Sequence, residues 1–237
     1  PIPGSAASCA RLRDAGASVL YVTNMSALTV GEQEAKLGRH GNDAVGREVT
    51  SAKAVATLTE PGQRAAVIGG RGVHEALAAV GVEAAAEGPV DVLVVGMDQS
   101  FDYAALKRAT LAVRDGARLL ATNDDPSYPT TEGLLPGAGS IVAAVERATG
   151  VTATVAGKPH EAAASLIRSR LGASGVVVGD RPDTDGEFAA TIGYDFALVL
   201  SGAMGEADLP VTPVPATVAA DLATLVDRAF ESAPARD

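Results

Sequence analysis

The sequence contains one cysteine, no tryptophan and only 3% aromatic residues among its 237 positions. A single cysteine, Cys9, excludes an intramolecular disulfide and a zinc site built from cysteines. The three histidines are dispersed and have no metal-ligand spacing. Small aliphatic side chains must therefore build the core, and the hydrophobic fraction of 47% is sufficient for a sizeable one. Cys9 falls on a predicted helix, where we expect a small buried residue.

The sequence also lacks a basic block and a long apolar run. Its 29 acidic and 19 basic residues give a net charge of −10, which disfavours binding to nucleic acid or to an anionic membrane. No apolar run approaches the roughly 18 residues that cross a bilayer, and residues 1–16 do not resemble a signal peptide. We therefore predict a cytoplasmic protein in which any anionic ligand is held by a local site.

Short apolar runs alternate with helical patterns along most of the chain. Thr29 and Glu32 have the spacing of a capping box at the start of one helix, and a Pro- and Gly-rich loop is expected over 124–139. This alternation predicts an α/β protein with parallel sheets covered by helices, arranged as one sheet or two. The predicted strands are 17–24, 64–70, 91–98, 117–123, 153–159, 175–180 and 195–202.

Polar residues lie at the carboxyl ends of three of the predicted strands. Thr23 and Asn24 end the first, Lys158 lies near the end of the fifth, and Asp180 ends the sixth. Ligands bind at the carboxyl ends of parallel strands, so a hydroxyl, an ammonium and a carboxylate could converge there. Such a set suits a phosphate together with Mg²⁺, which prefers oxygen ligands and keeps several waters.

The stretch GDRPDTD (179–185) places three carboxylates on one loop. Asp180 is placed to ligate Mg²⁺, Asp185 to hold a metal-bound water or to orient Lys158, and Asp183 to face solvent. The residues alone leave other interpretations open, because clustered aspartates are also common in turns and helix caps, and Lys158 could lie on the surface. This set still lacks a nucleophile.

Three stretches in this order resemble motifs two, three and four of the haloacid dehalogenase superfamily of phosphohydrolases: VTNMS (22–26), GKP (157–159) and GDRPDTD (179–185). Residues 94–109 and 122–140 resemble its p-nitrophenyl phosphatase branch. That branch includes NagD-type nucleotide phosphatases, pyridoxal phosphatases and glycerol-phosphate phosphatases. The resemblance extends to about residue 202.

The resemblance implies a Rossmann-like parallel-sheet core with an inserted α/β cap domain. The core would comprise residues 1–56 and 153–237, and the cap residues 57–152. The implied activity is Mg²⁺-dependent hydrolysis of small phosphorylated metabolites through an aspartyl-phosphate intermediate. The resemblance is also compatible with a homodimer formed through the cap.

The resemblance also implies a role for each motif residue. Thr23 and the backbone amide of Asn24 would bind phosphate, and Lys158 would balance the charge of the nucleophile and the phosphate. Asp180 would ligate Mg²⁺, directly or through water, and Asp185 would support the site. These roles agree with phosphoryl transfer, which needs positioning and neutralisation of oxygen charge.

Substrate selection is expected from the cap loop that begins near residue 122. Asp124 and Asp125 offer hydrogen-bond acceptors there, and Tyr128 offers one aromatic surface. The loop contains no basic residue, which favours a small polyol or sugar phosphate over a nucleotide. The alternative is that the three side chains only shape a Pro-rich turn.

The sequence departs from the family pattern at two points. Motif one, a strand ending in D-x-D, is absent, although PIPG commonly follows it closely; Met25 stands where the branch usually has a second asparagine. We therefore expect the natural polypeptide to continue upstream by roughly 10–30 residues that carry the nucleophile. A chain that began at Pro1 would be inactive.

Two other functions compete with the enzyme. The first is a degenerate, inactive relative that binds a phosphometabolite or a partner, and the absent motif and Met25 favour it. Retention of Lys158, Asp180 and Asp185 disfavours it, since a binder has little use for an intact metal loop. The second is a phosphoacceptor receiver domain, which explains neither the chain length nor the inserted cap.

Overall fold

The computed structural model describes residues 2–232, and the chain divides into two compact units. Unit 1 comprises Pro1–Tyr21, Glu34–Arg47 and Ile167–Asp237, and unit 2 comprises Val22–Gln33 and Glu48–Leu166. This division differs from the predicted core and cap, whose boundaries stay predictions. Among the described residues, no helix combines the length and the apolar character needed to cross a membrane.

Unit 2 contains a five-stranded parallel sheet in the order β4-β3-β5-β6-β9, as the alternating pattern predicts. Its central strand is a continuous apolar run whose four residues are all buried, because both faces of such a sheet are covered. The strands are β3 (Arg64–Ile68), β4 (Glu83–Ala84), β5 (Val92–Val95), β6 (Arg118–Ala121) and β9 (Thr154–Val155).

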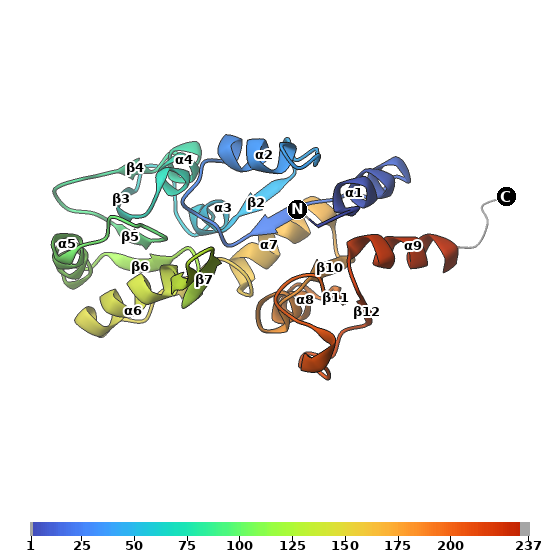
Figure 1. Ribbon diagram of the computed structural model, residues 1–237. Helices are drawn as coiled ribbons and strands as arrows, with labels where there is room; N and C mark the ends of the chain where they lie inside the picture. The colour runs from blue at the N-terminus through green and yellow to red at the C-terminus, as the bar shows by residue number, and fades with distance from the viewer. Residues whose placement is uncertain (1, 233–237) are drawn as a thin grey trace. The chain divides into compact units, whose positions relative to one another are not determined.

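Helices α5 (Tyr103–Arg114) and α6 (Ala138–Thr149) pack side by side against this sheet (Figure 1). Val142 and Val145 of α6 share one buried cluster with Leu93 of β5. Asp102 caps the start of α5, and its carboxylate accepts the N–H of Ala105 at 2.7 Å. The remaining helices of this unit are α3 (Ser51–Ala56) and α4 (Arg71–Ala79).

Three elements continue across the boundary between the units: β1 (Tyr21–Thr23), α2 (Val30–Gly38) and α7 (Glu161–Leu171). Strand β1 pairs with β2 (Glu48–Thr50). At the start of α2 the predicted capping box is confirmed. Thr29 N–H donates to Glu32 at 2.9 Å, and Glu32 N–H donates to Thr29 Oγ1 at 3.3 Å. The bond from the Thr29 backbone lowers the pKa of Glu32.

Unit 1 contains a three-stranded parallel sheet in the order β10-β11-β12. Helix α1 (Ser5–Asp14) packs against α9 (Leu222–Ser232), and Arg11 pairs there with Asp227 at 2.6 Å. Cys9 on α1 is buried, as predicted. The other elements are β10 (Val176–Gly179), a π-helical turn (Pro182–Gly186), α8 (Glu187–Ile192), β11 (Asp195–Val199), a 3₁₀ turn (Glu206–Asp208) and β12 (Thr217–Ala219).

Strand β10 is one of the two edge strands of the sheet in unit 1. Within residues 2–232 it pairs with β11 alone, and its Val176 and Val178 side chains are 59% and 41% exposed. Parallel strands are usually buried on both faces, and apolar edges usually carry a protective feature. The edge is compatible with a further parallel strand beside β10, and the predicted upstream strand stays a prediction.

The loop expected over 124–139 contains a β-hairpin instead. Strands β7 (Ser127–Thr130) and β8 (Gly133–Pro136) pair antiparallel around a turn at residues 131–132, and Gly133, directly after the turn, has a φ of 116°. That backbone conformation favours glycine. The Pro and Gly residues that predict a loop therefore lie within or beside the two short strands.

Candidate active site

Lys158 and Asn24 are brought together in unit 2, although 134 positions separate them in the sequence. The Lys158 N–H donates to Asn24 Oδ1 at 2.9 Å, and Asn24 Nδ2 donates to the Lys158 carbonyl at 3.0 Å. Lys158 is half-buried, so it is not a fully exposed surface lysine. The two residues border a shallow depression lined by Val22, Thr23, Asn24, Val49, Thr50, Ser51, Gly157, Lys158 and Ala163.

Thr23 lies at the end of β1 and lines the same depression. Its Oγ1 accepts the N–H of Met25 at 3.1 Å. A hydroxyl has one donor and two acceptor positions, so Thr23 can still donate its proton to an anion. Met25 thus contributes its backbone N–H to the turn that follows β1.

The backbone carbonyl of Asn24 is fixed by two polar side chains that the sequence analysis missed. Ser51 Oγ donates to it at 2.7 Å, and Asn123 Nδ2 donates at 2.9 Å. Asn123 is buried, and its amide also donates to Thr122 Oγ1 at 3.2 Å. No motif spacing links Ser51 or Asn123 to Asn24; the TN pair at 122–123, at the carboxyl end of the predicted strand 117–123, was the available signal.

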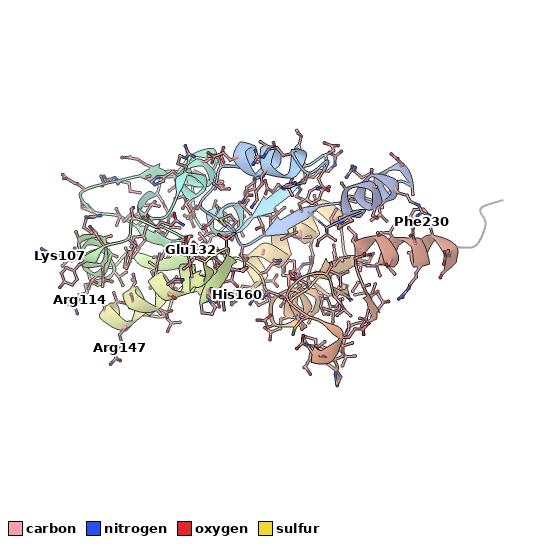
Figure 2. The ribbon with its side chains drawn as sticks, in the orientation of Figure 1. Lys107, Arg114, Glu132, Arg147, His160 and Phe230 are labelled. Atoms are coloured by element: carbon pink, nitrogen blue, oxygen red, sulfur yellow. The ribbon has the colours of Figure 1, made fainter. Side chains whose placement is uncertain are left out.

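The two acidic residues expected to contact substrate have separate partners in unit 2. Asp125 Oδ2 accepts a hydrogen bond from Asn24 Nδ2 at 2.9 Å. Asp124 pairs with His160 at 3.1 Å, and this hydrogen bond holds the pKa of the Asp124 carboxyl below its usual range. Figure 2 labels His160, which lies just ahead of α7. Sequence reasoning missed His160 because it forms no metal-ligand spacing with the other histidines.

Tyr128 lies on β7, the first strand of the hairpin, and is half-buried. Its hydroxyl accepts a hydrogen bond from Gln99 Nε2 at 3.1 Å. This bond joins the hairpin to the segment after β5. The predicted contact with a leaving group stays a prediction.

The carboxylate loop lies in unit 1, directly after β10. Asp180 Oδ2 accepts the N–H of Ala203 at 2.7 Å, and Asp185 Oδ2 accepts the N–H of Arg181 at 3.3 Å. Asp185 is buried within the π-helical turn. Asp183 has a side-chain exposure of 68%, as expected for a solvent-facing residue, and its hydrogen bond with Arg181 lowers its pKa.

Two glycines make room for these carboxylates. A Cβ placed on Gly179 would overlap the Asp185 carboxylate, and a Cβ on Gly202 would overlap the Asp180 carboxylate. Neither glycine has a positive φ, so the absent side chain matters here through space and not through backbone conformation. The backbone of Gly179 therefore packs directly against the Asp185 carboxylate, and that of Gly202 against the Asp180 carboxylate.

The donor chemistry of this loop suits part of a magnesium site. Asp180 and Asp185 offer hard carboxylate oxygens, and Mg²⁺ usually takes one or two protein carboxylates together with waters and substrate phosphate. Over residues 2–232, no group of three or more His, Cys, Asp or Glu side chains is placed to hold a metal. Mg²⁺ would therefore need further ligands from water, from substrate or from another carboxylate.

Two family models match the chain. One is described as haloacid dehalogenase-like hydrolase and matches residues 1–83, and the other is described as HAD-hydrolase-like and matches residues 155–225. These matches lie at the two ends of the sequence and include all three quoted motifs.

Named relatives match across most of the chain. A D-glycerol 3-phosphate phosphatase of Mycobacterium tuberculosis is 38% identical over 211 residues, which are 85% of this chain and 59% of the relative. The chain thus spans less than two thirds of that relative's length. An acid sugar phosphatase of Staphylococcus epidermidis is 36% identical over 205 residues, which are 84% of this chain and 79% of the relative.

Solved structures show the same fold. A glycerol phosphate phosphatase from Mycobacterium tuberculosis in complex with magnesium has a TM-score of 0.87 at 35% identity, covering 95% of this chain and 71% of that one. A p-nitrophenyl phosphatase from Archaeoglobus fulgidus has a TM-score of 0.90 at 26% identity, covering 96% and 92%.

Proposed function

The chain belongs to the haloacid dehalogenase-like phosphoric monoester hydrolases, in their p-nitrophenyl phosphatase branch, and we propose that it hydrolyses small phosphorylated metabolites with Mg²⁺. One observation above all supports this proposal: specific local contacts hold Lys158, Asp180 and Asp185 in place. Hydrogen bonds to Asn24 anchor the lysine backbone, and glycines make room for both carboxylates. A degenerate binding protein would have little use for an intact metal loop, which disfavours that alternative.

We propose that Thr23, the Asn24 amide and Lys158 bind the phosphate. An aspartate on the predicted upstream strand would attack phosphorus and form an aspartyl-phosphate, while a second aspartate two residues later gives a proton to the departing oxygen as the P–O bond breaks. Water, losing a proton to that second aspartate, would then attack the intermediate, release inorganic phosphate and restore the first aspartate. Asp180 would hold Mg²⁺, with Asp185 in support, and the bound ion would supply charge neutralisation.

We propose a small polyol or sugar phosphate as the substrate class. Residues 122–139 contain no Lys or Arg to bind a second phosphate. Asp124 and Asp125 supply acceptors that suit substrate hydroxyl groups. The names of the mycobacterial and staphylococcal relatives, a glycerol 3-phosphate phosphatase and an acid sugar phosphatase, agree with this class. The cap homodimer and the cytoplasmic location stay predictions.

The proposal is tested with the natural polypeptide, including whatever residues are encoded ahead of Pro1. We expect phosphate release from glycerol 3-phosphate and sugar phosphates with a kcat/KM at least about 10-fold higher than from nucleotides. Release should stop when EDTA removes Mg²⁺ and return when Mg²⁺ is added. Phosphate binding without hydrolysis of any phosphomonoester, p-nitrophenyl phosphate included, would favour the degenerate binding protein.

Replacing Tyr128 by Ala should change the ranking of substrates. We expect the ratio of kcat/KM for glycerol 3-phosphate to that for p-nitrophenyl phosphate to change by about 10-fold, because one substrate contact is altered while the core chemistry is kept. Tyr103→Ala is the matched control, since Tyr103 is 82% exposed on α5. Equal losses for both substrates would mean that Tyr128 supports folding and takes no part in selection.

A further inference from the structure

We propose that the side chain of Asn24 is the positioning residue of Lys158. It holds both backbone groups of the lysine and thereby fixes the point from which the ammonium reaches a phosphate. This inference rests on the proposed function, in which Lys158 is a phosphate ligand. It gives the Asn24 side chain a task separate from that of its backbone amide.

The side-chain amide of Asn24 makes the hydrogen bonds that a neighbouring strand would make to the backbone of Lys158. Strand β9 pairs with β6, and the pairing continues through Ala156 N–H to Ala121 O at 2.9 Å and Gly157 N–H to Thr122 O at 2.8 Å. Lys158 is the next residue. Its N–H and C=O bond to Asn24 Oδ1 and Nδ2, at 2.9 and 3.0 Å. A side-chain amide offers an acceptor and donors as a strand backbone does.

The Asn24 amide is itself held in one orientation. Asp125 Oδ2 lies 2.9 Å from Nδ2 and can only accept while ionised, so the nitrogen of the amide must face it. The backbone carbonyl of Asn24 accepts hydrogen bonds from Ser51 Oγ at 2.7 Å and from Asn123 Nδ2 at 2.9 Å. Two separate segments of unit 2, one at Ser51 and one at residues 123–125, therefore fix this one residue.

Gly157 permits the close approach of Asn24 to the Lys158 backbone. A Cβ on Gly157 would lie 2.6 Å from Asn24 Oδ1 and 2.5 Å from the Thr122 carbonyl oxygen. Any side chain at residue 157 would push the amide away from the Lys158 N–H. The glycine of GKP is thus explained by the Asn24 side chain together with the Thr122 carbonyl, which both lie too close to where a Cβ would be.

Lysine carries its charge on a flexible stem of four carbons, so its position depends on the backbone that holds the stem. Loss of the Asn24 amide would leave the half-buried N–H and C=O of Lys158 without these partners and free the loop to shift. Misplacement of a binding group by about 1 Å can cost about 100-fold in rate. Asn24 should therefore matter most for a ligand that needs the ammonium.

The test is a double-mutant cycle with Asn24→Ala and Lys158→Met in the natural polypeptide, read out as the inhibition constant of orthovanadate. We expect the inhibition constant of vanadate to rise by about 100-fold in K158M and by about 10-fold in N24A. The double variant should be no weaker than K158M, because Asn24 acts through the lysine. Asn42→Ala is the control, since the Asn42 side chain accepts a bond from the Tyr21 hydroxyl at 3.3 Å and has no part in the Lys158 contacts.

Asn24→Asp provides a second variant of the same shape, in case N24A does not fold. Its carboxylate can still accept from the Lys158 N–H, but it cannot donate to the Lys158 carbonyl and it repels Asp125. Its vanadate affinity should fall at least as far as that of N24A. Urea unfolding of each variant separates loss of affinity from loss of stability.

Three results would overturn the inference. Additive losses in the double variant would show that Asn24 acts independently of Lys158. Lower stability with normal vanadate affinity in both Asn24 variants would leave Asn24 a purely structural residue. Normal vanadate affinity in K158M would show that Lys158 is not a phosphate ligand and would overturn both the proposed role and this inference. Reduced vanadate affinity in K158M together with normal affinity in the Asn24 variants would contradict only this inference.

Discussion

Replacing Asp180 by asparagine should lower Mg²⁺-dependent phosphatase turnover of the natural polypeptide by about 1,000-fold or more. The substitution keeps the shape of the side chain and an oxygen that can accept the Ala203 N–H, which lies 2.7 Å from Asp180 Oδ2. It removes the negative charge and one carboxylate oxygen. The fold should therefore persist while the contribution of Asp180 to the metal site is lost. Initial rates over a wide range of Mg²⁺ concentration measure the effect.

Asp183→Asn is the matched control for this prediction. Asp183 belongs to the same loop, but its side chain is 68% exposed and pairs with Arg181 at 2.8 Å. Surface ion pairs contribute little to stability, so turnover should stay within about twofold of the unmodified protein. Near-normal turnover of D180N at saturating Mg²⁺ would remove Asp180 from the mechanism.

The parts of the fold that the sequence predicts well are those set by long, uniform patterns. The run Val92–Val95 is apolar throughout and forms the central strand of a parallel sheet, and Thr29 with Glu32 forms the expected capping box. Strands β4 and β12 are only two and three residues long. Such short strands leave too few residues for a period to emerge, and their pairing depends on distant neighbours.

The hairpin shows why composition can mislead. Pro129 and Pro136 lie within β7 and β8, whose ladder is a single antiparallel pair. A two-stranded ribbon has free edges on both sides, so proline can occupy positions that need no N–H donor. Proline and glycine therefore predict a loop where the chain forms a ribbon whose turn lies at residues 131–132.

The candidate site was predictable where residues stand at strand ends and hidden where they act through neighbours. The rule that ligands bind at the carboxyl ends of parallel strands identified Thr23, Asn24 and Lys158, and the structure places these three around one depression. Asn123 and His160 were missed, because each contacts a partner 99 or 36 positions away without a recognisable spacing. Only the three-dimensional structure shows such supporting contacts.

A substitution at Gly202 tests whether Mg²⁺ binding depends on the position of the Asp180 carboxylate as well as on its charge. A Cβ on Gly202 would overlap the Asp180 carboxylate, so Gly202→Ala must displace that carboxylate from the Ala203 N–H. We expect turnover at limiting Mg²⁺ to fall by about 100-fold, because misplacement of a ligand by about 1 Å is enough for such a loss. The Mg²⁺ concentration for half-maximal rate should rise, and saturating Mg²⁺ should restore part of the turnover.

Gly31→Ala is the control for G202A, because a Cβ on Gly31 in α2 meets no atom within 4 Å and Gly31 has no positive φ. It should leave the Mg²⁺ dependence unchanged, and circular dichroism with urea unfolding should show both variants folded. Adding G202A to D180N should cause no further loss of turnover, because the side chain at residue 180 that G202A displaces is already an uncharged amide in D180N. An unchanged Mg²⁺ dependence in folded G202A would contradict the prediction, since the carboxylate would then serve the metal equally well from another position.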